Sequence, residues 1–323
     1  MEVATEKSDD GDSGNDEPAD ALYSVERQVN VEKTDYVSEP GSSIAPPDSV
    51  IVRLELLTLI SERNKQELSN IHIESLPPEV LLAVFSYLDD FSLWNVANVC
   101  QRWRTLIMYE VPLQKWEDLT VRRFPLYKPL LIVDDWFQTY TALMNNCSCS
   151  VCLQQMAVKI HPPGEESSWR RNRLRSELKI LRSDPPDGIQ AIPLDPPTCC
   201  HWQATIQGPV GSPYEGGIFF LYLQVPYSYP MCPPVVRFLT KIFHPNISRH
   251  GDVGIDSIHY NWSLALTLSK VLISVQSLLT DPYCEVCMEP EIGKLYTTDR
   301  FKFETIARRW TWRYAMTDLM PNL

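Results

Sequence analysis

The residues with the most evident chemistry in this sequence are its cysteines, of which there are nine. Cys147, Cys149 and Cys152 lie close together and His161 follows them. Three thiolates and an imidazole can hold zinc in a tetrahedral site. The Cys-x-Cys-x-x-Cys spacing differs from that of a standard zinc finger, and no second Cys-x-x-Cys pair lies nearby. We therefore expect plain reduced cysteines and no bound metal, with zinc as the alternative.

A second group, Cys284 and Cys287, has the Cys-x-x-Cys spacing of half a metal site, but no partner pair is evident. The first residues lack the apolar core of a signal peptide, so we expect a reducing compartment, where disulfides do not persist. Free thiols and a cytoplasmic or nuclear location are the expectation.

The stretch HPNISRHGDVGIDSIHYNW, residues 244–262, has the outline of a reactive-site loop. It offers a His-Pro-Asn turn, a glycine-containing loop and a tryptophan. Asn246 has a side-chain amide that can donate to an oxyanion, but Gly254 has no side chain. Ser257 is a weaker nucleophile than a cysteine.

Charge is concentrated at the start of the chain. The 323 residues carry a formal charge of −12, and residues 1–48 hold 13 acidic and three basic side chains. This segment lacks apolar periodicity, so we expect an acidic disordered tail. The nearly neutral remainder argues against nucleic-acid binding. No apolar run reaches the roughly 18 residues of a membrane span.

Two helical regions should follow the tail. Residues 49–72 have apolar residues at helical spacing from Ile51 to Ile60, so we expect a helical lead-in. In residues 73–107, Pro77 and Pro78 stand at a helix start, where a missing N–H costs nothing. Two acidic residues end that helix, and two further short helices are expected after it.

The pattern Leu-Pro-x-Glu-Val-Leu, then Phe-x-Tyr-Leu, then Val-Cys-x-x-Trp-Arg, resembles the F-box. We assign the F-box to residues 73–118. The resemblance implies docking on the Skp-type adaptor of a cullin–RING ubiquitin ligase. By analogy, the contact residues would be Leu76, Pro77, Leu81, Phe85 and Leu88. The alternative is that they are core residues of a helical bundle. Residues 119–166 mix aromatic and aliphatic side chains, so we expect an ordered, cysteine-containing connecting segment.

The last part of the chain alternates helices and strands. A helix is expected over 170–188, with a leucine stripe and a basic face that consists of Arg170, Arg171, Arg173, Arg175, Lys179 and Arg182. This face suits an acidic partner such as an activating enzyme, or is simply solvated. Strand-like runs over 201–208, 218–226 and 233–240 predict an antiparallel meander. Two more helices are expected over 264–282 and 299–316.

Residues 167–318 resemble the ubiquitin-conjugating enzyme fold in HWQATIQGP, SPYEGGIFFL, PYSYP, HPNI and IARRW. The resemblance implies a domain with a four-stranded antiparallel meander sheet. The expected fold class is therefore α+β, with a small all-α F-box of three helices in front.

Three chemical parts belong to that family: a cysteine that carries ubiquitin, an asparagine that stabilises the oxyanion, and a nearby acid. On alignment the asparagine is Asn246, the cysteine position is Gly254, and Val286 stands where the acid lies. The resemblance thus implies a domain without a catalytic residue. Asn246 would then serve loop hydrogen bonding.

We therefore expect a binding module in place of an enzyme, in a substrate-receptor or regulatory subunit of an SCF-type ligase that promotes turnover of a bound protein. The positions that match ligase-contact loops of the family are Met231, Leu264 and Ala265. Expected partners are the adaptor and cullin, with ubiquitin, an active conjugating enzyme or a RING ligase as further candidates. Two alternatives are an active enzyme that uses Cys284 or Cys287, and a decoy that occupies the adaptor.

Overall fold

The computed structural model describes residues 73–255 and 261–316. The predicted acidic tail and the predicted helix over 49–72 lie outside the described residues, as do Ser257 and its neighbours. Within the described ranges no helix has both the length and the apolar character needed to cross a membrane.

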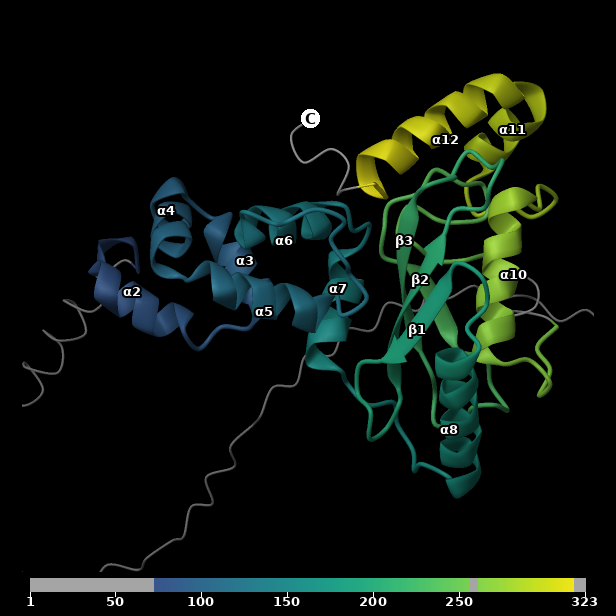
Figure 1. Ribbon diagram of the computed structural model, residues 1–323, viewed down its shortest axis with the longest axis horizontal. Coiled ribbons are helices and arrows are strands. Elements are labelled where there is room, and N and C mark those ends of the chain that lie inside the picture. Colours follow the sequence, from purple (N-terminus) through teal and green to yellow (C-terminus); the bar gives the residue numbers. More distant parts are fainter. Residues whose placement is uncertain (1–72, 256–260, 317–323) are drawn as a thin grey trace, which may run out of the picture. The chain divides into compact units, whose positions relative to one another are not determined.

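The first part of the described chain is helical (Figure 1). Its elements are η1 (Ile73–Ser75), α2 (Pro78–Phe85), α3 (Asp90–Ala97), α4 (Gln101–Glu110), α5 (Leu113–Arg123), α6 (Trp136–Asn145) and α7 (Ser150–Val158). The three short helices predicted over residues 73–107 are α2, α3 and α4. Pro78 is the first residue of α2, and the Asp89 carboxylate caps α3 by accepting from the N–H of Ser92 at 2.9 Å. The boundary predicted at residue 118 falls inside α5.

A buried ion pair joins these helices. The guanidinium of Arg123 donates to both carboxylate oxygens of Asp90 at 2.6 Å and to the carbonyl oxygen of Leu153 at 2.6 Å. The hydroxyl of Tyr140 donates to the same carboxylate at 3.0 Å. The network thus connects α3, α5, α6 and α7 around a core that includes the fully buried Trp116.

The second part contains the sheet. Its elements are α8 (Ser168–Ser183), β1 (Ile189–Pro193), β2 (His201–Gln207), β3 (Ile218–Gln224), β4 (Val235–Phe238), α10 (Leu268–Thr280), α11 (Pro290–Thr298) and α12 (Arg300–Tyr314). The strands form one antiparallel sheet in the order β1-β2-β3-β4, which confirms the predicted meander and the α+β class. Figure 1 shows α10 running beside the sheet and α11 and α12 at one end of it.

Both faces of the sheet are covered. Side chains alternate along β3, so Leu221 packs in the core formed with α10, whereas Phe220 and Tyr222 belong to the core of the helical part. Gln203 on β2 is fully buried between the two. Its amide donates to the carbonyl oxygen of Arg123 at 3.0 Å and accepts from the N–H of Leu126 at 3.3 Å.

The predicted basic face of α8 needs one correction, at Arg170. This side chain is fully buried, and its guanidinium donates to the carbonyl oxygens of Thr198 at 2.7 Å and Pro226 at 2.9 Å. It also pairs with Glu166 at 3.0 Å, which compensates the charge. The cations of α8 that remain exposed are Arg171, Arg175, Lys179 and Arg182.

Candidate functional site

Gly254 lies in a loop that is tied back to the His-Pro-Asn turn. Its N–H donates to the carbonyl oxygen of Asn246 at 2.9 Å, and Ile247 pairs with Val253 in an antiparallel bridge. A Cβ atom added at Gly254 would lie 2.7 Å from Cγ and 2.9 Å from Sδ of Met288. Met288, which is 41% exposed, would therefore have to shift to admit a side chain at position 254.

The side chain of Asn246 holds the loop that follows α10. It is fully buried, and its Nδ2 donates to the carbonyl oxygens of Tyr283 at 2.6 Å and Val286 at 3.0 Å. Its Oδ1 accepts from the N–H of Tyr283 at 2.9 Å. An amide has two N–H donors, and both are used here, so neither points at an oxyanion.

Both ring nitrogens of His244 are also engaged in hydrogen bonds to the backbone. Its Nδ1 accepts from the N–H of Asn246 at 3.0 Å, so the proton lies on Nε2, which donates to the carbonyl oxygen of Leu278 at 2.9 Å. Burial lowers the pKa of His244 to about 4. A neutral imidazole with both nitrogens bonded supports the turn and offers no base.

Cys284 and Cys287 lie in the same loop, after α10. Burial raises the pKa of Cys284, with the neighbouring Cys287 thiol adding to the effect, and this disfavours its thiolate. The thiol of Cys287 donates to the carbonyl oxygen of Cys284 at 3.4 Å. It also packs closely on Gly293, where a Cβ would lie 2.3 Å from the sulfur. These are the features of structural thiols.

The positions assigned to ligase contacts are exposed. Met231 is 61% exposed and Leu264 is 46% exposed, and Ala265 is exposed beside it. The indole N–H of Trp262 donates to the carbonyl oxygen of Pro230 at 2.8 Å, which holds the two loops together. Two apolar loops of the domain thus present one surface.

The residues assigned to the adaptor contact divide between core and surface. Leu81 and Phe85 are buried in the helical core, Leu76 and Leu88 are partly buried, and Pro77 is exposed. Their roles in adaptor binding stay a prediction. Val80 and Val84 of α2 are each 43% exposed, and Tyr87, which follows the helix, is 91% exposed.

The zinc alternative at Cys147, Cys149, Cys152 and His161 finds no support in the described residues, where these four do not come together. The thiol of Cys147 donates to the carbonyl oxygen of Leu143 at 3.3 Å, and burial raises its pKa to about 12. His161 instead lies with Asp195 and Cys200, their ligand atoms within 4.8 Å of one another. No spacing in the sequence signals this group, because α8 and β1 separate His161 from the other two residues.

Two family models match the chain. A model described as F-box-like matches residues 73–113, and a model described as ubiquitin-conjugating enzyme matches residues 173–311. These ranges lie inside the predicted segments 73–118 and 167–318. The F-box-like match covers α2 to α4, and the second match covers the sheet with α10, α11 and most of α12. The chain therefore combines an F-box-like domain with a ubiquitin-conjugating enzyme domain in one α+β protein.

Proposed function

We propose that this protein is a non-enzymatic subunit of an SCF-type cullin–RING ubiquitin ligase, acting in the cytoplasm or nucleus to promote ubiquitination and turnover of a bound protein. The F-box-like domain docks the Skp-type adaptor. The ubiquitin-conjugating enzyme domain serves as a binding module for another component of the pathway or for the target protein.

The lack of a side chain at Gly254 carries the non-enzymatic part of the proposal. Gly254 has no atom that can form a thioester, and a side chain there would meet Met288 at 2.7 Å. Asn246 and His244 retain the shape of the turn, but their polar atoms are engaged in backbone hydrogen bonds. These contacts favour a role of this loop in binding and not in catalysis.

The exposed apolar loops favour a RING ligase or a similar component as the partner of this domain. Met231 and Leu264 are large apolar side chains in solvent, and such patches often mark protein contacts. The exposed cations of α8 suit an acidic surface next to it. This surface is distinct from the loop around Gly254.

A thioester assay tests the non-enzymatic proposal. The full chain is incubated with activating enzyme, ubiquitin and ATP, and a reducible ubiquitin adduct is sought on a non-reducing gel. We expect no adduct. An adduct that disappears in Cys284→Ser or Cys287→Ser, but persists in the exposed-thiol control Cys232→Ser, would establish the alternative of an active enzyme with a displaced cysteine.

Adaptor binding is tested on the exposed face of α2. Leu81 and Phe85 are unsuitable for this test, because their loss would also damage the helical core. We expect Val80→Asp combined with Val84→Asp to abolish capture of a Skp-type adaptor, because charges would enter an apolar contact. Val121→Asp, at a 52% exposed position on α5, is the matched control. Equal capture by all three proteins would refute docking through α2.

A further inference from the structure

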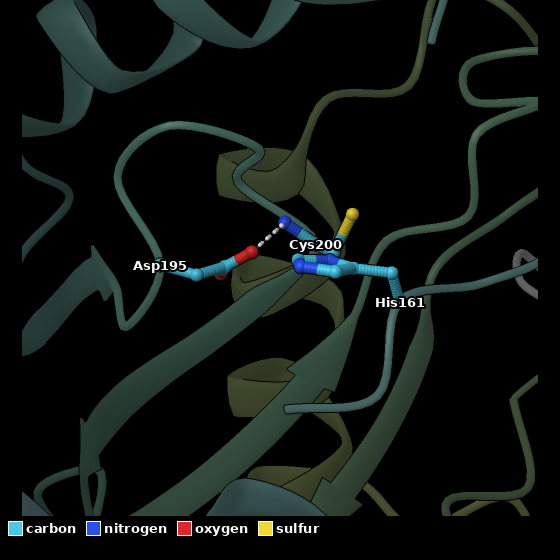
Figure 2. Close-up of side chains that lie close together, drawn as sticks. All are labelled: His161, Asp195 and Cys200. Carbon is cyan, nitrogen blue, oxygen red and sulfur yellow. Dashed lines mark hydrogen bonds between the residues drawn. The ribbon is translucent and has the colours of Figure 1, made fainter. Parts of the chain in front are cut away.

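The linker between α7 and α8 carries His161 to the loop between β1 and β2. Figure 2 shows the imidazole of His161, the carboxylate of Asp195 and the thiol of Cys200 gathered at one place. Their ligand atoms all lie within 4.8 Å of one another. Asp195 and Cys200 are buried, whereas His161 is exposed and free to adjust its side chain.

The donor set has the chemistry of a transition-metal site. One sulfur, one imidazole nitrogen and one carboxylate oxygen are the three ligand types that zinc binds in proteins. Zinc sites with three protein ligands complete their tetrahedron with water. Magnesium and calcium, which prefer all-oxygen sites, do not fit this set.

The carboxylate of Asp195 is fixed in place and retains an acceptor position. Its Oδ1 accepts from the N–H of His201 at 2.7 Å, and its Oδ2 accepts from the N–H of Cys200 at 3.0 Å and from the hydroxyl of Thr198. A carboxylate has about four acceptor positions, and these bonds use three. Hydrogen bonds of this kind orient the ligands of metal sites.

The surrounding charges also suit a divalent cation. A zinc ion with one thiolate, one carboxylate and a neutral imidazole is neutral as a group. Arg170 donates to the sulfur of Cys200 at 3.4 Å, but its own charge is paired with Glu166. Metal binding needs the thiolate form of Cys200 and therefore releases a proton.

We propose that His161, Asp195 and Cys200 form a zinc site, with water as the fourth ligand. A metal ion bound there fastens the linker to the sheet where the helical part gives way to α8. Two hydrogen bonds already hold the linker there: His201 Nε2 donates to the carbonyl oxygen of Ile160 at 3.0 Å, and the ammonium of Lys159 donates to that of Leu194 at 2.8 Å.

Cobalt serves as the spectroscopic probe for the site. The full chain, reduced and freed of metal by a chelator, is titrated with Co²⁺. We expect a near-ultraviolet thiolate-to-cobalt band and the visible bands of tetrahedral Co²⁺, saturating at about one equivalent and displaced by Zn²⁺. Zinc is also expected to protect residues 159–167 from limited proteolysis.

Single substitutions identify the ligands. Cys200→Ser should abolish the thiolate band, and His161→Ala should weaken binding by at least about 10- to 100-fold, the range seen even for groups that only support a ligand. Cys232→Ser and His250→Ala, at an exposed thiol and an exposed imidazole, are the controls and should bind as the unchanged protein does.

Because His161 is exposed, its substitution leaves the fold intact, so the test holds even if Cys200→Ser fails to fold. Absence of the thiolate band in the unchanged protein would overturn the proposal. So would a band of undiminished strength in His161→Ala, since the thiols elsewhere would then be the ligands.

Discussion

Asn246 acts as a clamp between the His-Pro-Asn turn and the loop after α10. The side chain is fully buried and makes three hydrogen bonds to the backbone of that loop. If Asn246 holds the shape of this loop, its substitution should lower the stability of the fold, whether or not the protein catalyses a reaction.

We expect Asn246→Ala to lower the free energy of unfolding by about 1–3 kcal/mol, because three partly buried peptide groups lose their hydrogen-bond partner. Urea unfolding followed by far-ultraviolet circular dichroism measures the change. Asn172→Ala, at an exposed position of α8, should stay within about 0.5 kcal/mol. Equal stability of the two variants would contradict the clamp.

His244 gives the stability a pH dependence with a defined sign. Its folded pKa of about 4 lies below the usual value near 6.5, so the unfolded chain binds more protons between these limits. The contribution is complete above pH 6.5 and decreases as the pH falls toward 4.

We therefore expect the free energy of unfolding to fall by about 3 kcal/mol through this residue between pH 6.5 and pH 4. Denaturant titrations at a series of pH values check this. In His244→Gln the curve should be flatter over the same interval. Parallel curves for the two proteins would mean that the imidazole is not buried neutral.

At the scale of elements, the helical part depends on a buried ion pair, which water does not solvate. Asp90 and Arg123 are 33 positions apart, and their pairing holds α3 against α5, while Tyr140 adds α6. Removing one partner leaves the other charge buried alone, and removing both does not.

We expect Arg123→Met to cost about 3–5 kcal/mol of stability, and the double variant Asp90→Leu with Arg123→Met to cost less than the single one. Chemical unfolding of the four proteins of the cycle provides the coupling energy. Strictly additive losses would show that the pair contributes little beyond its separate residues.

The sequence reveals these elements well but reveals their environment poorly. The spacing of apolar residues, together with the Pro, Gly and Asp residues that bound the segments, predicted α2 to α4, α8, the meander and the long helix α10. These elements depend on local patterns. Arg170 is expected on the basic face of its helix because a charge is normally exposed. Its ion-pair partner Glu166 is local, but the backbone carbonyl oxygens that accept from its buried guanidinium belong to distant segments.

The same limit applies to the sites. The glycine at 254 was found by alignment on a family pattern, but nothing in the sequence indicates that Met288 fills the space beside it. His161 was grouped with the nearest cysteines along the chain, whereas the fold brings it to Cys200. Linear proximity predicts local structure and fails for groups assembled by tertiary contacts.

At the scale of the whole described molecule, the sheet belongs to two cores at once. Its residues Phe220 and Tyr222, with Leu239 after β4, pack among the aromatic side chains of the helical part. The ubiquitin-conjugating enzyme domain therefore has an apolar face that the helical part covers and shields from solvent.

We expect a fragment that begins at residue 167 to unfold at lower urea concentration than the full chain and to bind a hydrophobic dye, because that apolar face loses its cover. Dye fluorescence and unfolding midpoints measure the two effects. A fragment as stable and as unreactive to dye as the full chain would show that the two parts fold independently.

The contact at Gly254 also bears on how a thiol could return to this position. A single-base change turns two of the four glycine codons into cysteine codons. With Met288 present, the new side chain meets an occupied space, and this exposed, flexible side chain must turn aside to admit it. Regaining a thiol at position 254 therefore requires the rearrangement of one side chain and no second mutation.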